Sequence, residues 1–412
     1  MVPLTIHQAR WVVPVSGPVL DHGAVVVAGG RIVAVGPASR LRRYYQGKCY
    51  DHGDGAILPA LVNAHVHLEF SALRGRIPRQ SALGPWLRDA MAEFAQLSAA
   101  EINQGVQEGL AELRRFGTIL VGEISNTGLS LPELSKSGLE FHYFYECLGF
   151  DHLNSGPLED DFPIFASSEA RARDNFSAAA HAPYSVSPAL FGRIFDWNRG
   201  YRRRTTVHLA ESREEVEFLS QGNGFFQHLL QQRGRWPAAY QPPQCSPVVY
   251  LDRLGGLGPQ TLAVHVIWLS AFDLELLARR SAWAVLCPRS NQFTGTGFPR
   301  LPELYQAGVR LALGTDSLAS NDDLNLFKEI LTLQQQYPEF APDKLLALAT
   351  SQGALALGRG HDLGSLSPGK LAALLFIPIA SDRHFWPDLL EAGAAGKISW
   401  VAASGAEGGY GN

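Results

Sequence analysis

The chain has few charges and few cysteines, and it has no long apolar run. Charged residues make up only 18% of its 412 residues, and the net charge of −4 provides no basic surface for nucleic acid or an anionic membrane. No apolar run reaches membrane-spanning length. The first one, 11–20, is interrupted by two prolines and a glycine, so we expect no signal peptide. Nucleic acid and membranes are therefore excluded from the predicted partners.

The four cysteines lie far apart and form no CxxC pair. They are Cys49, Cys147, Cys245 and Cys287. This spacing differs from that of a disulfide framework or a cysteine-based zinc site. We interpret them as reduced, mostly buried thiols of a cytoplasmic protein. A chain of this length buries enough apolar surface to fold without a disulfide or a structural metal.

The order of apolar runs and helical patterns predicts an α/β fold. From Ala56 onward, short β-branched runs alternate with longer helical stretches, which is typical of βα units around a parallel sheet. We predict a (β/α)₈ TIM barrel over 56–357, with one strand for each run. The runs are 56–63, 118–123, 141–147, 176–182, 205–210, 262–267, 283–287 and 309–314.

Both ends of the chain carry β-like runs without the helical stretches. Residues 1–55 hold several short runs, and a further one occupies 371–377 after a turn-rich segment. We predict that 1–55 and 358–412 join in a small β-sandwich domain beside the barrel. Between the fifth and sixth predicted strands, the segment 221–258 is rich in Gln, Pro and Gly. We predict a long loop or lid there.

Metal-ligand side chains follow several of the apolar runs. His65 and His67 end the first run, and residues two apart in a strand point to the same face. Taken alone, this pair is also compatible with two ordinary histidines. His208, His265 and Asp316 end the fifth, sixth and eighth runs. Because catalytic groups of such barrels lie at the carboxyl ends of the strands, we predict a site for zinc or ferrous iron.

This set of residues in an eight-stranded pattern resembles the amidohydrolase superfamily, most closely its cytosine-deaminase and chlorohydrolase-like branch. The resemblance covers nearly the whole chain and implies one divalent metal per chain, Zn²⁺ first and Fe²⁺ second. The implied ligands are His65, His67, His208 and Asp316. Binuclear members bridge two metals with a fourth-strand lysine, but no lysine lies between Lys136 and Lys328. The implied partners are a small-molecule amine and water, with a homodimer left open.

The resemblance also implies a catalytic set. Glu211 stands three residues after His208, similar to the His-x-x-Glu arrangement of deaminases in this branch. There the glutamate carries a proton to a ring nitrogen. Water activated by the metal attacks the amine-bearing ring carbon, and ammonia leaves. His265 orients the water and Asp316 accepts a proton, so Glu211, His265 and Asp316 are the implied catalytic residues.

Substrate contacts are predicted near the strand ends. The resemblance implies that His181 contacts a purine or its sugar, and that Trp86 is the aromatic that closes over the ring. Glu69 is a candidate for binding a hydroxyl or ring group, and Arg74 for binding a carboxylate. Asn291, after the seventh strand, is a candidate for a further polar contact.

The leading predicted function is hydrolytic deamination of an aminopurine nucleoside derivative. The stretch 68–75 is most similar to aminodeoxyfutalosine deaminases, with S-adenosylhomocysteine, methylthioadenosine and adenosine as competing substrates. The alternatives at the same site are a free-base deaminase for guanine or cytosine and a triazine chlorohydrolase. An alternative of another class is an inactive relative kept as a binding protein, against which the retention of the ligands, Glu211 and His265 argues.

Overall fold

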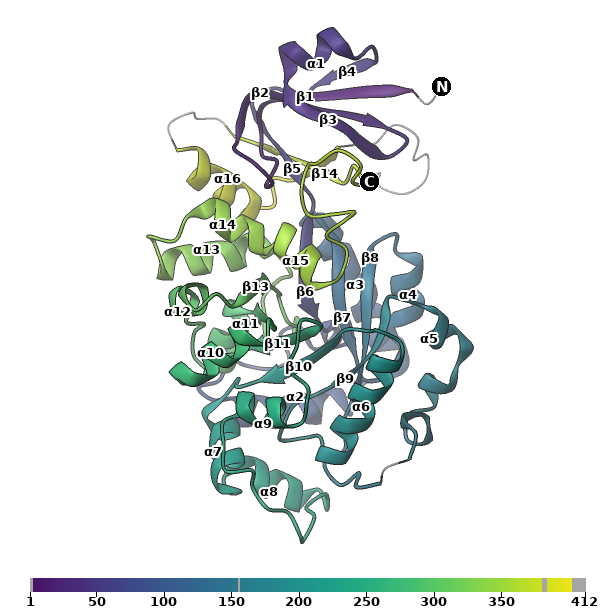
Figure 1. The fold of residues 1–412 in the computed structure, drawn as a ribbon, viewed down its shortest axis with the longest axis vertical. Coiled ribbons are helices and arrows are strands. Elements are labelled where there is room, and N and C mark those ends of the chain that lie inside the picture. Colours follow the sequence, from purple (N-terminus) through teal and green to yellow (C-terminus); the bar gives the residue numbers. More distant parts are fainter. Residues whose placement is uncertain (1–2, 155, 380–383, 402–412) are drawn as a thin grey trace.

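The computed structural model describes residues 3–154, 156–379 and 384–401 and confirms an α/β fold with parallel sheets (Figure 1). Two parallel sheets hold four strands each. The first contains β6 (Leu61–Val66), β7 (Thr118–Ser125), β8 (Glu140–Cys147) and β9 (Phe176–Ala180). The second contains β10 (Thr205–Leu209), β11 (Thr261–His265), β12 (Trp283–Leu286) and β13 (Arg310–Leu313).

Hydrogen bonds connect the two parallel sheets on both sides. The backbone N–H of His208, on β10, donates to the carbonyl of His181, just after β9, at 2.9 Å. On the other side, the N–H groups of Thr315 and Asp316, after β13, both donate to the carbonyl of His65, on β6, at 3.1 Å. These hydrogen bonds bring together the carboxyl ends of β6, β9, β10 and β13. The residues at these ends include His65, His181, His208 and Asp316.

A mixed sheet unites both ends of the described chain. Its strand order is β15-β14-β5-β1-β2-β3, and β4 pairs with β1. The strands are β1 (Leu4–Val12), β2 (Leu20–Ala28), β3 (Arg31–Pro37), β4 (Lys48–Asp51), β5 (Gly55–Pro59), β14 (Leu374–Pro378) and β15 (Ser399–Val401). Residues 1–2, 380–383 and 402–412 of the predicted terminal unit lie outside the described residues. The β-sandwich and the domain bounds stay predictions.

The first apolar run, predicted as one strand over 56–63, forms parts of two strands in different sheets. β5 pairs with β1 and β14, whereas β6 pairs with β7. Ala60, between them, donates its N–H to the Ala373 carbonyl at 2.9 Å, and Leu61 donates to Gly117 at 2.8 Å. Both strands are buried along their whole length, so an unbroken apolar sequence gives no sign of the change of sheet.

Helices flank the strands. They are α1 (Ala38–Tyr44), α2 (Leu83–Phe94), α3 (Ala99–Arg115), α4 (Ser130–Lys136), α5 (Ser168–Ala172), α6 (Pro188–Gly200), α7 (Arg213–Gln221), α8 (Phe225–Gln232), α9 (Pro247–Arg253), α10 (Ala271–Arg279), α11 (Pro288–Thr294), α12 (Leu301–Gln306), α13 (Leu326–Gln336), α14 (Pro342–Leu348), α15 (Ser351–Ala356) and α16 (Phe385–Ala394). In α3, a capping box between Ser98 and Glu101 satisfies N–H groups of the first turn. Its buried face repeats at Ile102, Val106 and Leu113, the spacing of an amphipathic helix.

The prediction of a long loop over 221–258 is wrong, because this segment contains α8 and α9, whereas its alternative, a lid, stays a prediction. Phe226 is buried, and Leu229 and Leu230 pack against the core three and four residues later. This is a helical period. The Gln, Pro and Gly residues of the segment lie mostly outside these helices. The average composition of the segment therefore does not indicate the two short helices.

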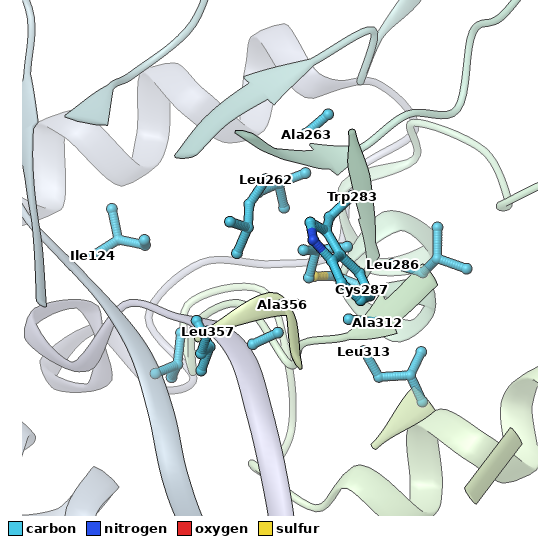
Figure 2. Packing of buried hydrophobic residues seen from close by; sticks show 14 of the residues in the cluster. Ile124, Leu262, Ala263, Trp283, Leu286, Cys287, Ala312, Leu313, Ala356 and Leu357 are labelled. Carbon is cyan, nitrogen blue, oxygen red and sulfur yellow. The ribbon is translucent and has the colours of Figure 1, made fainter. Parts of the chain in front are cut away.

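Buried aliphatic and aromatic side chains fill the space between the parallel strands and the helices (Figure 2). Leu262, Trp283 and Leu313 come from three adjacent strands and are at most 4% exposed.

All four cysteines are free; Cys147 and Cys287 are buried, and Cys49 is exposed. Among the described helices, none is long and apolar enough to cross a membrane.

His142, on β8, is a buried base that cannot easily take up a proton. Its Nε2 lies 2.7 Å from the Ser177 hydroxyl. Burial, followed by the charges of Arg204 and Arg203, lowers the pKa of His142 from 6.5 to about 3. Between these pH values the unfolded chain binds a proton that the folded chain does not. Stability at this site therefore falls as the pH drops below about 6.5.

Between pH 7 and pH 5, we expect the free energy of unfolding of the wild type to fall by about 2 kcal/mol more than that of His142→Gln, because the glutamine does not titrate. Urea unfolding of the metal-free protein at both pH values measures this difference. His228→Gln is the matched control, since His228 is exposed. A pH dependence identical in the wild type and both variants would contradict a suppressed pKa at His142.

Candidate active site

Three histidines and one aspartate converge at the carboxyl ends of β6, β10 and β13. One nitrogen each from His65, His67 and His208 lies within 4.8 Å of the others. The Nε2 atoms of His67 and His208 are 3.3 Å apart. Asp316 places its Oδ1 3.7 Å from Nε2 of both His65 and His67. The structure thus brings the four predicted ligands into one buried cluster.

The donor set fits a divalent metal. Both ring nitrogens of His65 are buried without a hydrogen-bond partner among the described residues, which is unusual unless they face a ligand. Three imidazoles and one carboxylate suit Zn²⁺ or Fe²⁺. The hydroxyls of Ser290 and Ser320 donate to Oδ2 of Asp316, at 2.5 and 2.9 Å. These bonds leave Oδ1 facing the histidines.

The strands that carry these groups end in backbone conformations that are rare for residues other than glycine. Ala210, His265 and Asp316 have φ angles of 52°, 73° and 58°. Such left-handed residues cost about 1–3 kcal/mol each and persist where the surroundings hold them, often at functional sites. After β10, the Glu215 carboxylate accepts the N–H groups of Ala210 and Glu211, at 3.1 and 2.9 Å. Glu215 therefore stabilises the turn that presents Glu211.

Beside the metal-ligand cluster lies a pair of acid and base side chains. Glu211 Oε1 is 3.6 Å from His265 Nε2. The side-chain amide of Asn291 donates to His265 Nδ1 at 3.1 Å, which leaves the proton of the neutral ring on Nε2. Burial raises the pKa of Glu211 to about 8, with Asp316 adding to the effect and His208 opposing it. A carboxyl group that stays protonated near neutrality can act as a general acid.

Glu146, at the end of β8, contacts His208 on the side away from His67. Its Oε1 lies 3.3 Å from His208 Nδ1, and its Oε2 accepts from the Asn126 amide at 2.7 Å. His208 Nδ1 also lies 2.9 Å from the His181 carbonyl. With Nδ1 held in this way, Nε2 is the nitrogen available for a metal. No local pattern in the sequence indicates this contact, because Glu146 and His208 are 62 positions apart.

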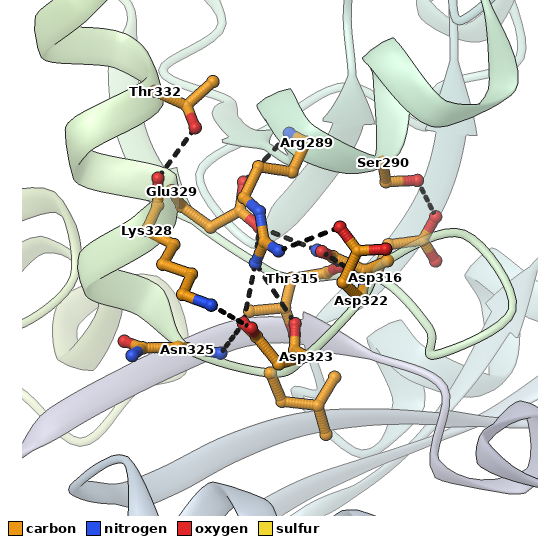
Figure 3. A network of polar contacts seen from close by, with 12 residues as sticks. Arg289, Ser290, Thr315, Asp316, Asp322, Asp323, Asn325, Lys328, Glu329 and Thr332 are labelled. Carbon is orange, nitrogen blue, oxygen red and sulfur yellow. Dashed lines mark hydrogen bonds and ion pairs between the residues drawn. The ribbon is translucent and has the colours of Figure 1, made fainter. Parts of the chain in front are cut away.

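The turn that carries Asp316 is fixed by a polar network on its outer side (Figure 3). The Asn321 amide donates to the Thr315 carbonyl at 3.0 Å and to the Glu329 carboxylate at 2.8 Å. The Arg289 backbone N–H donates to the same carboxylate at 3.0 Å, and its guanidinium pairs with Asp323 at 2.8 Å. The position of Asp316 is thus supported from α11 and α13.

A cavity of about 540 Å³ begins at this cluster, a volume typical of small-molecule sites. His67, His208, His265, Glu211 and Asp316 line its inner end. Its walls are mostly apolar and come from α2, α8 and the segment after β8. Two predicted substrate contacts, Trp86 and His181, line the cavity. The Trp86 indole N–H donates to the Ala319 carbonyl at 3.3 Å, and His181 Nδ1 lies 2.6 Å from the Ser185 hydroxyl.

The other three predicted contacts, Glu69, Arg74 and Asn291, are not among the described residues that line this cavity. The Glu69 carboxylate accepts the Ser125 hydroxyl at 2.5 Å, and Arg74 lies 2.5 Å from a Glu112 oxygen. Asn291 donates to His265. Contact of these three with a substrate would require a rearrangement of these bonds.

Comparisons with known proteins agree with the site. The Amidohydrolase family model matches residues 56–392, and an imidazolonepropionase-like composite domain matches 23–43. A 5-methylthioadenosine/S-adenosylhomocysteine deaminase of Syntrophobacter fumaroxidans is 32% identical, over 88% of this chain and 81% of the relative. An aminodeoxyfutalosine deaminase of Deinococcus radiodurans is 30% identical, over 83% of each chain. A zinc-bound adenosine deaminase of Xanthomonas campestris superposes with a TM-score of 0.82 at 27% identity, over 97% of this chain and 91% of that chain.

Proposed function

Because the chain belongs to the amidohydrolase family, we propose that it is a metal-dependent hydrolytic deaminase of an adenine-type nucleoside. The observation that carries this proposal is the buried Glu211 carboxyl group beside the metal-ligand cluster, at the inner end of a cavity of nucleoside size. The similarity to curated deaminases of adenine nucleosides supports the choice of substrate.

We propose zinc as the metal, held by His65, His67, His208 and Asp316. When bound, such a metal lowers the pKa of a coordinated water and so supplies the nucleophile near neutral pH. The similarity to a zinc-bound adenosine deaminase supports zinc over iron.

The protein's own side chains would supply positioning and proton transfer. Trp86 and His181 would hold the purine in the cavity, with its amine-bearing carbon toward the metal ligands. Glu211 would donate a proton to the adjacent ring nitrogen, which its raised pKa allows. The N–H of His265 Nε2 would hold the attacking water. Addition of water to the carbon, loss of the amine as ammonia and formation of a ring carbonyl complete the hydrolysis.

We further propose that the two parallel sheets are halves of one closed (β/α)₈ barrel over 56–357. The hydrogen bonds from His208 to His181 and from Asp316 to His65, at the two junctions, support closure. We propose that 1–55 and 358–412 form a separate small domain, which is supported by the backbone hydrogen bonds from Gly369 to Ile32 and from Ala372 to Gly30, both at 2.8 Å. In this arrangement the site lies at the carboxyl face of the barrel, where such barrels carry their catalytic groups.

The test is turnover of a panel of amines by the zinc-loaded protein. We expect ammonia release and an ultraviolet shift with at least one of adenosine, methylthioadenosine, S-adenosylhomocysteine and aminodeoxyfutalosine. Dialysis against a chelator should abolish the activity and Zn²⁺ should restore it. Ammonia release from guanine or cytosine alone would favour a free-base deaminase, and chloride release from a triazine a chlorohydrolase. Tight nucleoside binding without any turnover would favour an inactive binding protein.

A further inference from the structure

The cavity differs in charge between its two ends. The carboxylates that line it, Glu146, Glu211 and Asp316, all lie among the histidines at the inner end. Two arginines, Arg233 and Arg235, also line it. Both are exposed, whereas the three carboxylates are at most 7% exposed. The two arginines thus lie on the exposed side of the cavity, away from the metal-ligand cluster.

One face of α8 leads from the cluster toward this open end. Phe226, Leu229 and Leu230 of α8 line the cavity, and so does Arg233, the C-cap residue that directly follows the helix. The four residues keep the i, i+3, i+4, i+7 spacing of one helix face. Phe226 is 1% exposed and stacks on Tyr184, with ring centroids 3.6 Å apart. Tyr184 in turn contacts His181. Arg233 follows Phe226 by seven residues, about 10 Å along a helix axis.

The two arginines differ in their partners. Arg235 lies 2.9 and 3.1 Å from the two carboxylate oxygens of Asp151, so its charge is compensated. Arg233 lines the cavity, and its guanidinium has no ion pair or hydrogen bond within the described part of the chain. An arginine in this position offers a planar set of N–H donors to an anion that enters the cavity.

We infer that the open end of the cavity binds a carboxylate at the end of the nucleoside's sugar substituent, and that Arg233 recognises it. This inference rests on the proposed function and adds the class of substrate: adenine nucleosides with an extended substituent that ends in a carboxylate. Met91, Phe94, Leu229 and Leu230 line the apolar walls of the cavity. They would contact an uncharged linker between the sugar and the carboxylate.

The test compares two nucleosides that differ in this group. S-adenosylhomocysteine ends in an amino acid, with a carboxylate and an ammonium group, whereas methylthioadenosine ends in an uncharged methyl group. We expect Arg233→Met to raise KM for S-adenosylhomocysteine about tenfold, because a charge-assisted contact is lost. KM for methylthioadenosine and kcat for both should stay within about twofold of wild type, since methionine preserves most of the apolar stem. Arg279→Met is the matched control: Arg279 is an exposed arginine at the end of α10 that does not line the cavity.

The outcomes separate this inference from the proposed function. If Arg233→Met raises KM for both nucleosides equally, or for neither, Arg233 does not recognise a carboxylate, while the deaminase proposal stands. A similar loss in Arg279→Met would assign the effect to overall charge and also overturn the inference. If the wild type deaminates none of the panel of adenine nucleosides, the proposed function fails and the inference fails with it.

Discussion

Glu211→Gln should lower kcat by roughly 10²–10⁴, the usual contribution of one general acid–base group, and leave the metal content unchanged. Glutamine keeps the shape of the side chain but has no proton to give to the ring nitrogen. The Glu211 carboxyl group lies beside His265 and has its pKa raised to about 8, chiefly by burial. For the same reason, wild-type kcat/KM should decline above about pH 8, where Glu211 loses its proton.

Steady-state kinetics and elemental analysis of the same preparation measure both effects. Glu217→Gln is the control, because Glu217 is a partly exposed glutamate of α7, the helix that follows Glu211, and lies outside the cavity lining. It should keep the kcat of the wild type. Loss of metal from Glu211→Gln would show that Glu211 is a ligand, and full activity of this variant would refute its role in proton transfer.

The cluster of proposed metal ligands was predictable because each prediction depends on a local pattern. His65, His208 and Asp316 follow apolar runs, and parallel strands align their carboxyl ends at one edge. Strand periodicity and fold geometry therefore suffice to bring together residues that are far apart in sequence. Glu211 came instead from the resemblance, which matches its place three residues after His208, just beyond the end of β10.

The substrate contacts were less predictable, because they depend on pairings between distant segments. Arg74 follows the metal histidines closely in sequence, but a 3₁₀ helix over Leu68–Leu73 intervenes and Arg74 pairs with Glu112 on α3. Arg233 lies in a segment predicted as loop, and its cavity position depends on the helical spacing of α8. The position of a residue in the sequence does not reveal which side chain an arginine pairs with, or which face of a short helix lines a cavity.

The largest expected loss follows from Asp316→Asn. Burial would raise the pKa of Asp316, but His65, His67 and His265 outweigh it and hold the pKa well below its ordinary value. The carboxylate is therefore charged at any working pH, and asparagine removes that charge while keeping the shape. We expect metal affinity to fall by at least about 100-fold and turnover to fall to background, since both the ligand and the proton acceptor are lost.

Metal analysis after dialysis, together with ammonia release at saturating Zn²⁺, measures both losses. The wild type should retain about one metal per chain, as expected for a single four-ligand site without a bridging lysine. Asp322→Asn is the control, because Asp322 follows on the same loop but is largely exposed and pairs with Arg79. It should retain metal and activity. Wild-type activity in Asp316→Asn would show that the eighth-strand ligand is misassigned, and two metals per wild-type chain would contradict the single site. If excess Zn²⁺ restores full turnover to Asp316→Asn, the aspartate serves only as a ligand, and the proton acceptor must be sought among Glu211 and His265.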